Sequence, residues 1–355
     1  MGSLAKSNIL VIGFGGIGTM TAYNLEAGGL ASVTGVLRSN YNLVDKQGFN
    51  IWSCDHGEIS GWKPTSISRT VPDVRNTSTP PFDYVVVCTK NIPDIPPTVV
   101  EIIAPAITPS HTAIVLVQNG INIEKPVIAA FPSNIVISGI SRMSSAELRP
   151  AEIFHQDHDI LIIGAFRNPN IDPEVERRAA KHFTELYNAS GKATGQYAED
   201  VGFMRWRKLV YNASYNSLCA ITGMDTSTLR FTGTAPTELL LPVMLEVKSI
   251  ARAAGYQLAA DQEDVSLNGD ASDAYFRPSM QQDVEKGNYM EMEVIVGETV
   301  REAQRLGVPV PMLTFVYSLL KALQFKTQVK RGLVTLPAMK DYGADDMLAT
   351  GKKTT

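Results

Sequence analysis

The chain has 355 residues, of which 44% are hydrophobic and 19% are charged, and its formal net charge is −4. This composition is ordinary for a globular protein, and the length is sufficient for two domains that each bury a core. The weak negative charge and the lack of a basic tract argue against nucleic acid and against a membrane surface as partners.

The three cysteines, Cys54, Cys88 and Cys219, lie far apart in the sequence. An odd and sparse set of this kind indicates reduced thiols in a cytoplasmic protein, and the spacing is not that of zinc ligands, so we expect no metal site. No apolar run is long enough to cross a bilayer, and the N-terminus lacks the apolar region of a signal peptide. A cytoplasmic location without membrane attachment is therefore expected.

The first predicted element is a buried parallel strand over residues 9–12, which are all apolar. It leads directly into a G-x-G-x-x-G motif, and an amphipathic helix follows until Gly28. In such a motif the glycines permit a tight turn, let a pyrophosphate approach the backbone and let the helix pack on the strand. The N-terminus of the helix then binds the phosphates of this pyrophosphate. The alternative is a glycine-rich turn without a ligand, but a motif between a strand and a helix favours dinucleotide binding. The residues expected to bind the cofactor here are Gly13, Phe14, Gly15, Gly16, Ile17 and Gly18.

A second strand is predicted over residues 33–37, and Arg38 follows it, twenty residues after Gly18. NAD-binding sites usually carry Asp or Glu near this point for the ribose 2′-hydroxyl, whereas arginine suits the 2′-phosphate of NADP. The first acidic residue after the strand is Asp45. NADP is therefore favoured over NAD, and the alternative is that Arg38 is only a solvated surface residue.

Three more apolar runs predict sheet strands, at residues 84–88, 113–117 and 135–137. The ligands of open α/β sheets lie at the carboxyl ends of the strands. Lys90 follows the first of these runs and Asn119 follows the second, so both are expected at the cofactor edge of the sheet. The residues alone leave open whether either one is simply part of a loop.

The remainder of the first half has weaker patterns. Residues 49–75 predict irregular or hairpin strands, and residues 151–163 predict antiparallel strands at the edge of the sheet. A helix is expected over residues 174–190, because Pro173 precedes it and Gly191 ends it.

After Gly195 the pattern changes to long helical periods without a convincing strand, which places a domain boundary near residues 192–200. Asp200 is the expected N-cap of the first helix of this half. The expected organisation is a dinucleotide-binding domain at 1–195, an all-helical domain at 196–330 and a loose tail at 331–355. Further helices are expected at residues 237–254, within 261–273, from the run that starts at Ser279 to Gly307, and at 312–328.

The first helix of the second half carries an unusual polar stripe. Lys208, Asn212 and Asn216 are four residues apart among core residue types, and this spacing places them on one face of an α-helix. Burying such groups without partners is costly, so we interpret the stripe as the wall of a cleft that handles an oxygen-rich substrate. A later helix is expected to contain Glu291 and Glu293, and periodicity does not decide which of them faces inward.

These residues resemble the ketopantoate reductase (2-dehydropantoate 2-reductase) family over nearly all of residues 8–328. The resemblance implies an α/β fold in which a Rossmann-type dinucleotide-binding domain precedes an all-helical domain of the 6-phosphogluconate dehydrogenase C-terminal-like type. The matching pieces are the motif at 13–18, Arg38, Thr89 with Lys90, Asn119 with Gly120, the helix at 206–216 and the run at 279–297. The helix at 206–216 and the run at 279–297 are more specific than the glycine motif, which many folds share.

The resemblance also implies roles for individual residues. The family's catalytic acid is a lysine on the first helix of the C-terminal domain and matches Lys208, and the glutamate that orients this lysine matches Glu291. Lys90 and Asn119 match residues that contact the cofactor and flank the reacting centre. The family's substrate-binding residues match Asn212, Asn216 and Ser279. From spacing alone, an interhelical ion pair between Lys208 and Glu291 is the structural alternative.

The activity implied by the resemblance is NADPH-dependent reduction of ketopantoate to (R)-pantoate for pantothenate and coenzyme A synthesis. Hydride is delivered to the C2 carbonyl of the 2-oxo acid, and Lys208 acts as general acid. One rival is a related enzyme such as a 2-ketoisovalerate reductase or a D-2-hydroxyacid dehydrogenase. The other is a non-enzymatic NADP-binding redox sensor, which is disfavoured because the polar residues Lys208, Asn212 and Glu291 are all present.

Two points stay open at the level of sequence. Arg277 and Pro278 precede Ser279 where the family has small or polar residues, so the exact 2-oxo acid is undecided. The apolar faces of the C-terminal helices could serve a homodimer or simply the core of the domain.

Overall fold

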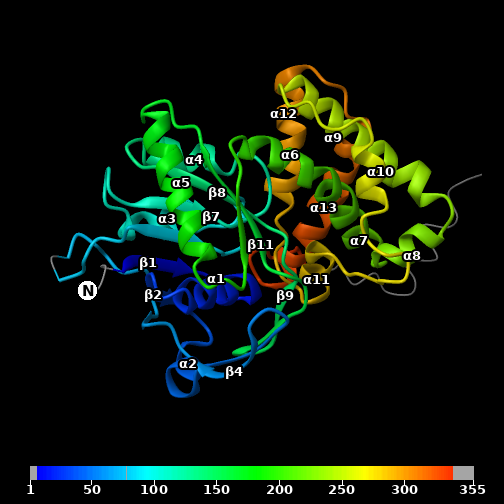
Figure 1. Cartoon of the computed structure of the whole chain (residues 1–355). Helices are drawn as coiled ribbons and strands as arrows, with labels where there is room; N and C mark the ends of the chain where they lie inside the picture. Colours follow the sequence, from blue (N-terminus) through cyan, green and yellow to red (C-terminus); the bar gives the residue numbers. More distant parts are fainter. Residues whose placement is uncertain (1–5, 77, 339–355) are drawn as a thin grey trace, which may run out of the picture.

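The computed structural model describes residues 6–76 and 78–338, and Figure 1 shows a sheet-based N-terminal half beside a helical C-terminal half. The main sheet consists of β1 (Ser7–Ile12), β2 (Ala31–Val36), β5 (Ser66–Ser68), β6 (Tyr84–Val87), β7 (Ala113–Leu116), β8 (Val136–Ser141), β11 (Ile160–Phe166) and β12 (Thr194–Tyr197). The strand order is β12-β11-β8-β7-β6-β1-β2-β5, and the neighbouring strands are parallel except for β8 and β11.

This order is that of a doubly wound, Rossmann-type sheet, as predicted. The strands β6 and β7 are buried along their whole length, because helices cover both faces of a parallel sheet. The prediction for residues 151–163 is wrong in one respect, since β11 lies inside the sheet and β12 forms its edge. Strand structure also continues to Tyr197, beyond the point where it was expected to end.

A second sheet covers the start of the first helix, α1 (Gly16–Ala27). It contains β3 (Phe49–Ser53), β4 (Gly57–Trp62), β9 (Ser145–Arg149) and β10 (Glu152–His155), in the order β4-β3-β10-β9. The pair β3 and β4 confirms the hairpin predicted within residues 49–75. The pair β3 and β10 is parallel and joins segments about a hundred residues apart in the chain, which no local pattern indicated.

The helices of the N-terminal half lie against the main sheet (Figure 1). The helix α5 (Pro173–Asn188) confirms the helix predicted over residues 174–190, and Asp172 caps it by accepting a hydrogen bond from the backbone N–H of Glu174 at 2.8 Å. The other helices of this half are short. They are α2 (Tyr41–Gln47), α3 (Val99–Ile103), the 3₁₀ turn η1 (Ala104–Ala106) and α4 (Glu124–Ala130), and α5 spans Pro173–Asn188.

The C-terminal half is helical, as predicted, and Asp200 caps its first helix by accepting from the N–H of Phe203 at 2.9 Å. Residues 331–338 contain neither helix nor strand, and the rest of the predicted tail lies outside the described residues. The helices are α6 (Val201–Tyr211), α7 (Ser217–Thr222), α8 (Thr226–Phe231), α9 (Leu241–Ala253), α10 (Gln262–Leu267), α11 (Ser279–Glu285), α12 (Glu298–Leu306) and α13 (Pro311–Lys330). Three π-helical turns interrupt them: η2 (Asn212–Asn216), η3 (Pro236–Leu240) and η4 (Glu293–Gly297).

Two of these turns correct the sequence analysis. The polar stripe does not lie on one regular α-helix, because η2 begins at Asn212 and widens the helix where the two asparagines lie. The run from Ser279 to Gly307 is not a single helix either, since α11 ends at Glu285 and Glu291 lies in the connection before η4. Single π turns inside α-helices often occur at functional sites, and both of these carry or adjoin predicted site residues.

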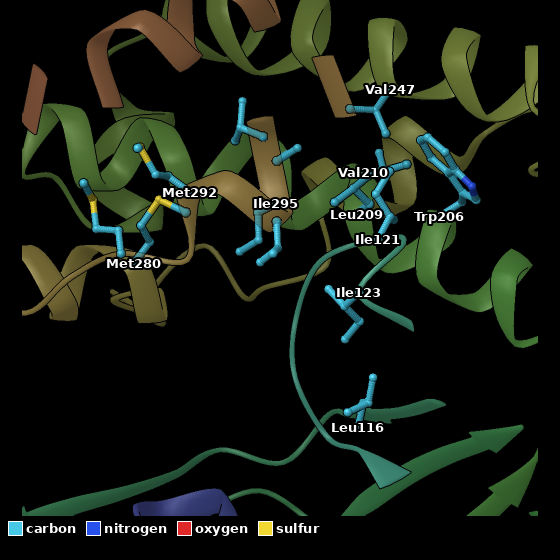
Figure 2. Close-up of a cluster of buried hydrophobic side chains, with 14 of the residues drawn as sticks. Leu116, Ile121, Ile123, Trp206, Leu209, Val210, Val247, Met280, Met292 and Ile295 are labelled. Carbon is cyan, nitrogen blue, oxygen red and sulfur yellow. The ribbon is translucent and has the colours of Figure 1, made fainter. Parts of the chain in front are cut away.

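One apolar core joins the two halves of the chain. It contains Ile121 and Ile123 from the segment after β7, together with Leu209 and Val210 of α6. Figure 2 shows Ile121 beside Leu209 and Val210, with Ile123 and Leu116 leading toward the sheet. This shared core holds α6 against the carboxyl end of β7, which is the predicted cofactor edge. Among the described residues, no helix has both the length and the apolar character required to cross a membrane.

Candidate active site

The glycine motif forms a tight cradle at the start of α1. Gly13 has a φ of 98°, and a Cβ at this residue would lie 2.7 Å from the backbone nitrogen of Thr89. A Cβ at Gly18 would lie 1.8 Å from the carbonyl oxygen of Gly13, so the helix packs directly on the turn. Among the described residues, no atom lies within 4 Å of the Cβ position at Gly15, and no side chain caps the helix. The cradle therefore fits a pyrophosphate that approaches the backbone at Gly15.

The other three residues of the motif, Phe14, Gly16 and Ile17, have little or no side chain available for contact with a cofactor. The side chain of Phe14 is buried and stacks on Phe49 with 5.8 Å between the ring centres. Gly16 lies under β9, because a Cβ there would be 2.3 Å from the carbonyl oxygen of Ser145. Ile17 packs against the same apolar core as Phe14. Phe14 and Gly16 thus offer only backbone groups to the cradle.

Arg38 is exposed just beyond the carboxyl end of β2. The neighbouring strand β5 ends at the same edge, since the N–H of Leu37 donates to the carbonyl of Ser68 at 2.9 Å. A second arginine, Arg69, follows β5 and lies over the ring of Tyr41 at 4.1 Å. Two guanidinium groups therefore follow adjacent strands at the position where a 2′-phosphate is expected.

The ammonium group of Lys208 is held at the junction of the two halves. Its Nζ donates to Oδ1 of Asn119 at 3.0 Å and to the backbone carbonyl of Ser141 at 2.7 Å. An ammonium group has three protons, and the described residues supply acceptors for two of them, so one N–H stays available for a further acceptor. These contacts bring the predicted acid to the carboxyl ends of β7 and β8.

Glu291 reaches Lys208 through Asn119. Oε2 of Glu291 accepts from Nδ2 of Asn119 at 3.2 Å, and Oε1 accepts from the backbone N–H of Asn91 at 3.1 Å. The Glu291 side chain is 5% exposed and lies 3.6 Å from Nζ of Lys90. The neighbouring Glu293 instead pairs with Arg301 and accepts from the hydroxyl of Tyr317. Of the two glutamates, Glu291 is therefore the one that faces the site.

Lys90 joins the two domains from the other side of Glu291. Its Nζ donates to Oδ2 of Asp283 on α11 at 2.7 Å. Burial lowers the pKa of Lys90, but the two carboxylates of Glu291 and Asp283 outweigh this effect and raise the pKa above its usual value. Lys90 is therefore a permanent cation at the edge of the site.

Asn212 lies directly beyond Lys208. It is 7% exposed, and among residues 6–76 and 78–338 its carboxamide has no hydrogen-bond partner. Lys208 and Asn212 line a cavity of about 10 Å³ together with Asn119 and Ile140, which is room for roughly one water molecule. The carboxamide of Asn212 lines this cavity beside the ammonium group, so a ligand there can complete its hydrogen bonds.

Asn216 lies one turn farther along the helix and contacts the start of α11. Its Oδ1 accepts from the backbone N–H of Met280 at 3.0 Å, and its carboxamide lies 3.4 Å from Oγ of Ser279. The structure thus brings Asn216 and Ser279 together, although they are far apart in the sequence.

The structure adds a buried arginine that the sequence analysis did not single out. Arg205 lies one turn before Lys208, and its Nε pairs with Oε1 of Glu124 at 2.6 Å. Its Nη1 donates to the backbone carbonyls of Gln118 at 2.9 Å and of Gly120 at 3.0 Å. Arg205 therefore holds the turn that carries Asn119.

These surroundings lower the pKa of Lys208 to about 8. Burial is the largest cause, and the positive charges of Arg205 and Arg142 act in the same direction while Glu291 opposes them. A lysine with a pKa near neutral pH can donate a proton far more readily than an ordinary lysine.

Two functional features were thus missed at the level of sequence. Asp283 lies in the run at 279–297, but nothing in the sequence indicated which residue it would contact. The structure shows that its partner is Lys90. Arg205 was not singled out because it lies outside the stripe of Lys208, Asn212 and Asn216, and an arginine on a helix is usually solvent-exposed. The sequence also did not indicate that Glu124, the partner of Arg205, would be buried.

The comparison with known families agrees with this geometry. The model of the ketopantoate reductase PanE/ApbA family matches residues 9–168, and the model of its C-terminal domain matches residues 200–324. The chain belongs to the ketopantoate reductase family. Its fold, a Rossmann-type domain followed by a helical domain, is the fold of that family.

Individual relatives cover nearly the whole chain. The uncharacterized protein YDL144C of Saccharomyces cerevisiae is 36% identical in an alignment that covers 92% of this chain and 96% of that protein. A 2-dehydropantoate 2-reductase of Nostoc is 25% identical over 88% of this chain and 94% of its own length. The crystal structure of 2-dehydropantoate 2-reductase from Methylococcus capsulatus matches with a TM-score of 0.77 and 32% identity, covering 90% of this chain and 97% of that one. As a member of this family the chain is an oxidoreductase of the ketopantoate reductase type.

Proposed function

We propose that the protein is an NADPH-dependent 2-oxo acid reductase whose substrate is 2-dehydropantoate and whose product is (R)-pantoate. One observation carries the proposal: Lys208, with a free N–H and a lowered pKa, adjoins the unpartnered carboxamide of Asn212 between the two domains. The glycine cradle fits the pyrophosphate of the cofactor, with Gly15 as the point of closest approach. When bound, NADPH supplies the hydride.

In this proposal Lys208 is the catalytic acid. Its free N–H donates to the carbonyl oxygen of the substrate, and the proton passes to that oxygen as negative charge develops there. Asn119 and the carbonyl of Ser141 hold Nζ in position, since each accepts one of its hydrogen bonds. Glu291 fixes the carboxamide of Asn119 and thereby acts on Lys208 indirectly.

The substrate-holding groups are Asn212, Asn216 and Ser279. Asn212 adjoins the acid, and Asn216 and Ser279 form a second polar pair farther along α6 and η2, suited to the hydroxyl or the carboxylate. In this proposal the helical domain moves away from the sheet when substrate enters, because the cavity at Lys208 is small. Binding energy from the carboxylate can then drive the closure that orients the carbonyl.

The test of this function is oxidation of NADPH by the purified full chain with a panel of 2-oxo acids. The proposal expects turnover with ketopantoate at a kcat/KM at least about tenfold above that for 2-ketoisovalerate, because a site that hydrogen-bonds a hydroxyl rejects the analogue without it. A preference for 2-ketoisovalerate or another 2-oxo acid would support the related-reductase alternative. Activity with no member of the panel would support a redox sensor.

The related-reductase alternative has a specific observation in its favour. The structure of D-mandelate dehydrogenase with NADH and anilino(oxo)acetate matches this chain with a TM-score of 0.76, at 18% identity and over 91% of the chain. This likeness concerns the fold, and it indicates that the same scaffold can serve a different 2-hydroxy acid. Arg277 and Pro278 precede the proposed substrate-binding Ser279, so they are the residues at which a different pocket wall would change the choice of substrate. The panel therefore includes 2-oxo acids with an aromatic group.

Replacing Arg38 by alanine is expected to raise the KM for NADPH by at least about tenfold and to change the KM for NADH by less than about twofold. The reason is that a guanidinium group contributes roughly 1.5–3 kcal/mol through hydrogen bonds to a charged acceptor, and only NADPH carries the 2′-phosphate. Steady-state kinetics with both cofactors measure the two values. Arg207→Ala, which removes an exposed arginine elsewhere, is the control. Equal losses for NADPH and NADH would contradict the proposed role.

The rate of reduction is expected to fall as the pH rises through about 8, the pKa of Lys208. The acid must be protonated, so the protonated fraction is near one below this pKa and decreases about tenfold per pH unit above it. The kcat/KM for the 2-oxo acid at saturating NADPH, measured from neutral to alkaline pH, gives this decrease, because kcat/KM reports the ionisation of the enzyme before the 2-oxo acid binds. A rate that stays constant about two pH units above the pKa would contradict the assignment of the acid.

We also propose that the protein forms a homodimer. Phe315, Leu319 and Phe325 are exposed on one face of α13, and Phe315 is 61% exposed. A structurally similar ketopantoate reductase, that of Staphylococcus aureus, is described as dimeric. Light scattering of the purified chain would give the mass of two chains if the proposal holds, and the mass of one chain otherwise.

A further inference from the structure

A group of metal-ligand side chains lies at the end of the second sheet, outside the residues assigned to cofactor and substrate. The strands β3 and β10 are parallel, and Ser53 is paired with His155. Because parallel strands end at the same edge, the residues after β3 come together with those after β10. Three of the five histidines of the chain, His56, His155 and His158, gather there.

The central residue of this group is His155. Its side chain is fully buried, and its Nε2 has no hydrogen-bond partner among the described residues. This nitrogen faces Oδ2 of Asp55 at 3.9 Å, and the other ring nitrogen lies 4.0 Å from Sγ of Cys54. One ligand atom each from Cys54, Asp55 and His155 lies within 4.8 Å of the others. A buried imidazole nitrogen without a partner is costly, and Nε2 faces a carboxylate with the thiol of Cys54 close to the same ring, so the group calls for a ligand.

The surrounding contacts hold the three side chains in place. The hydroxyl of Ser53 lies 2.8 Å from Nδ1 of His155 and orients the ring. Asp55 is 11% exposed, its Oδ1 lies 2.8 Å from Nδ1 of His158, and its Oδ2 accepts from the backbone N–H of Asp159 at 2.9 Å. Hydrogen bonds of this kind behind the ligands are a regular feature of protein metal sites.

We propose that Cys54, Asp55 and His155 bind one zinc-type divalent cation. Thiolate, imidazole and carboxylate together suit zinc, whereas calcium and magnesium take oxygen ligands only. Tetrahedral zinc bonds of about 2.0–2.3 Å place ligand atoms about 3.3–3.8 Å apart, whereas one ligand atom from each of the three residues lies within 4.8 Å of the others, so binding requires the turn at Cys54 to close by about 1 Å. Cys54 is exposed, which leaves a fourth position for water.

Such an ion would connect the two sheets. Cys54 and Asp55 lie in the turn between β3 and β4, and Asp55 is already bonded to Asp159 immediately before β11 of the main sheet. Binding replaces the thiol proton of Cys54 by the metal, and its free energy adds to the stability of the folded chain. The proposed role is therefore to fix the second sheet against the domain that holds the cofactor.

The test is metal binding by the chelator-treated full chain. Calorimetric titration with ZnCl₂ is expected to show one ion per chain, and MgCl₂ is expected to show none. Titration with CoCl₂ is expected to give tetrahedral visible bands and a near-ultraviolet thiolate charge-transfer band. Cys54→Ser, at an exposed position, should lose the thiolate band and bind zinc at least about tenfold more weakly.

The controls separate this site from other ligands. His111→Gln changes an exposed histidine elsewhere and should bind zinc like the parent chain. Asp55→Asn tests the carboxylate and should also weaken zinc at least about tenfold, with circular dichroism showing that the variant is folded. Absence of zinc binding, or zinc binding by Cys54→Ser that equals that of the parent, would overturn the proposal. Neither outcome depends on reductase activity.

Discussion

Replacing Lys208 by alanine is expected to lower turnover of the 2-oxo acid by about 10²–10⁴-fold, the usual loss when one positioned acid is removed. Binding of NADPH should be retained, because Lys208 contacts Asn119 and the carbonyl of Ser141 and not the glycine cradle. Single-turnover kinetics measure the chemical step, and fluorescence titration with NADPH measures the binding.

The neighbouring residue provides the matched control for this prediction. Arg207 is exposed on the same helix, so Arg207→Ala removes a positive charge next to Lys208 without touching the site. It should retain turnover within about twofold, as surface changes usually do. A Lys208→Ala variant that turns over at the parental rate would mean that water or another group donates the proton, and the assignment of the acid would be wrong.

The second large effect is expected from Arg205→Met, which removes one partner of a buried ion pair. The side chains of Arg205 and Glu124 are 4% and 0% exposed, and the loss should destabilise the fold by about 3–5 kcal/mol because Glu124 is left as an unpaired buried charge. The backbone carbonyls of Gln118 and Gly120 also lose a donor, so the turn that carries Asn119 becomes less ordered. Denaturant unfolding of the purified variant measures the free energy.

The same substitution carries a prediction about catalysis. The charge of Arg205 lowers the pKa of Lys208, so its removal should raise that pKa and move the alkaline limb of the pH–rate profile to higher pH. The double variant Arg205→Met with Glu124→Gln removes both charges and should recover part of the lost stability while keeping the shifted limb. Arg207→Met is the control. A limb that stays at the parental pH in both variants would show that Arg205 has only a structural role.

Much of the fold could be predicted because its signals are local. The strand at 9–12, the glycine motif and Arg38 follow one another in the chain, and each requires only its own backbone conformation or residue type. The N-cap at Asp200 and the buried runs that became β6 and β7 are signals of the same kind. Within residues 49–75 and 151–197 the hairpin of β3 with β4 and the helix α5 were predicted, but the pairing of β3 with β10 was not, because these two strands are far apart in the sequence.

The site shows the same limit. The spacing of Lys208, Asn212 and Asn216 indicated a shared stripe, but the π turn at Asn212 changes the helix there, and periodicity assumes a regular helix. The indirect link from Glu291 to Lys208 through Asn119 was not visible either. Glu291 lies outside any helix, so the direction of its side chain depends on the packing of distant segments.

The sequence by itself determined the two kinds of domain and the residue types at the site, since composition, periodicity and short motifs are properties of neighbouring residues, and its resemblance to known sequences indicated the family. Only the tertiary structure decided which partners these residues have. Arg205 meets Glu124, Lys90 meets Asp283, and His155 meets Asp55 because sheet pairing and domain contact bring separate segments together. Burial in those contacts then changes the acidity of Lys208, and burial is a property of the whole fold.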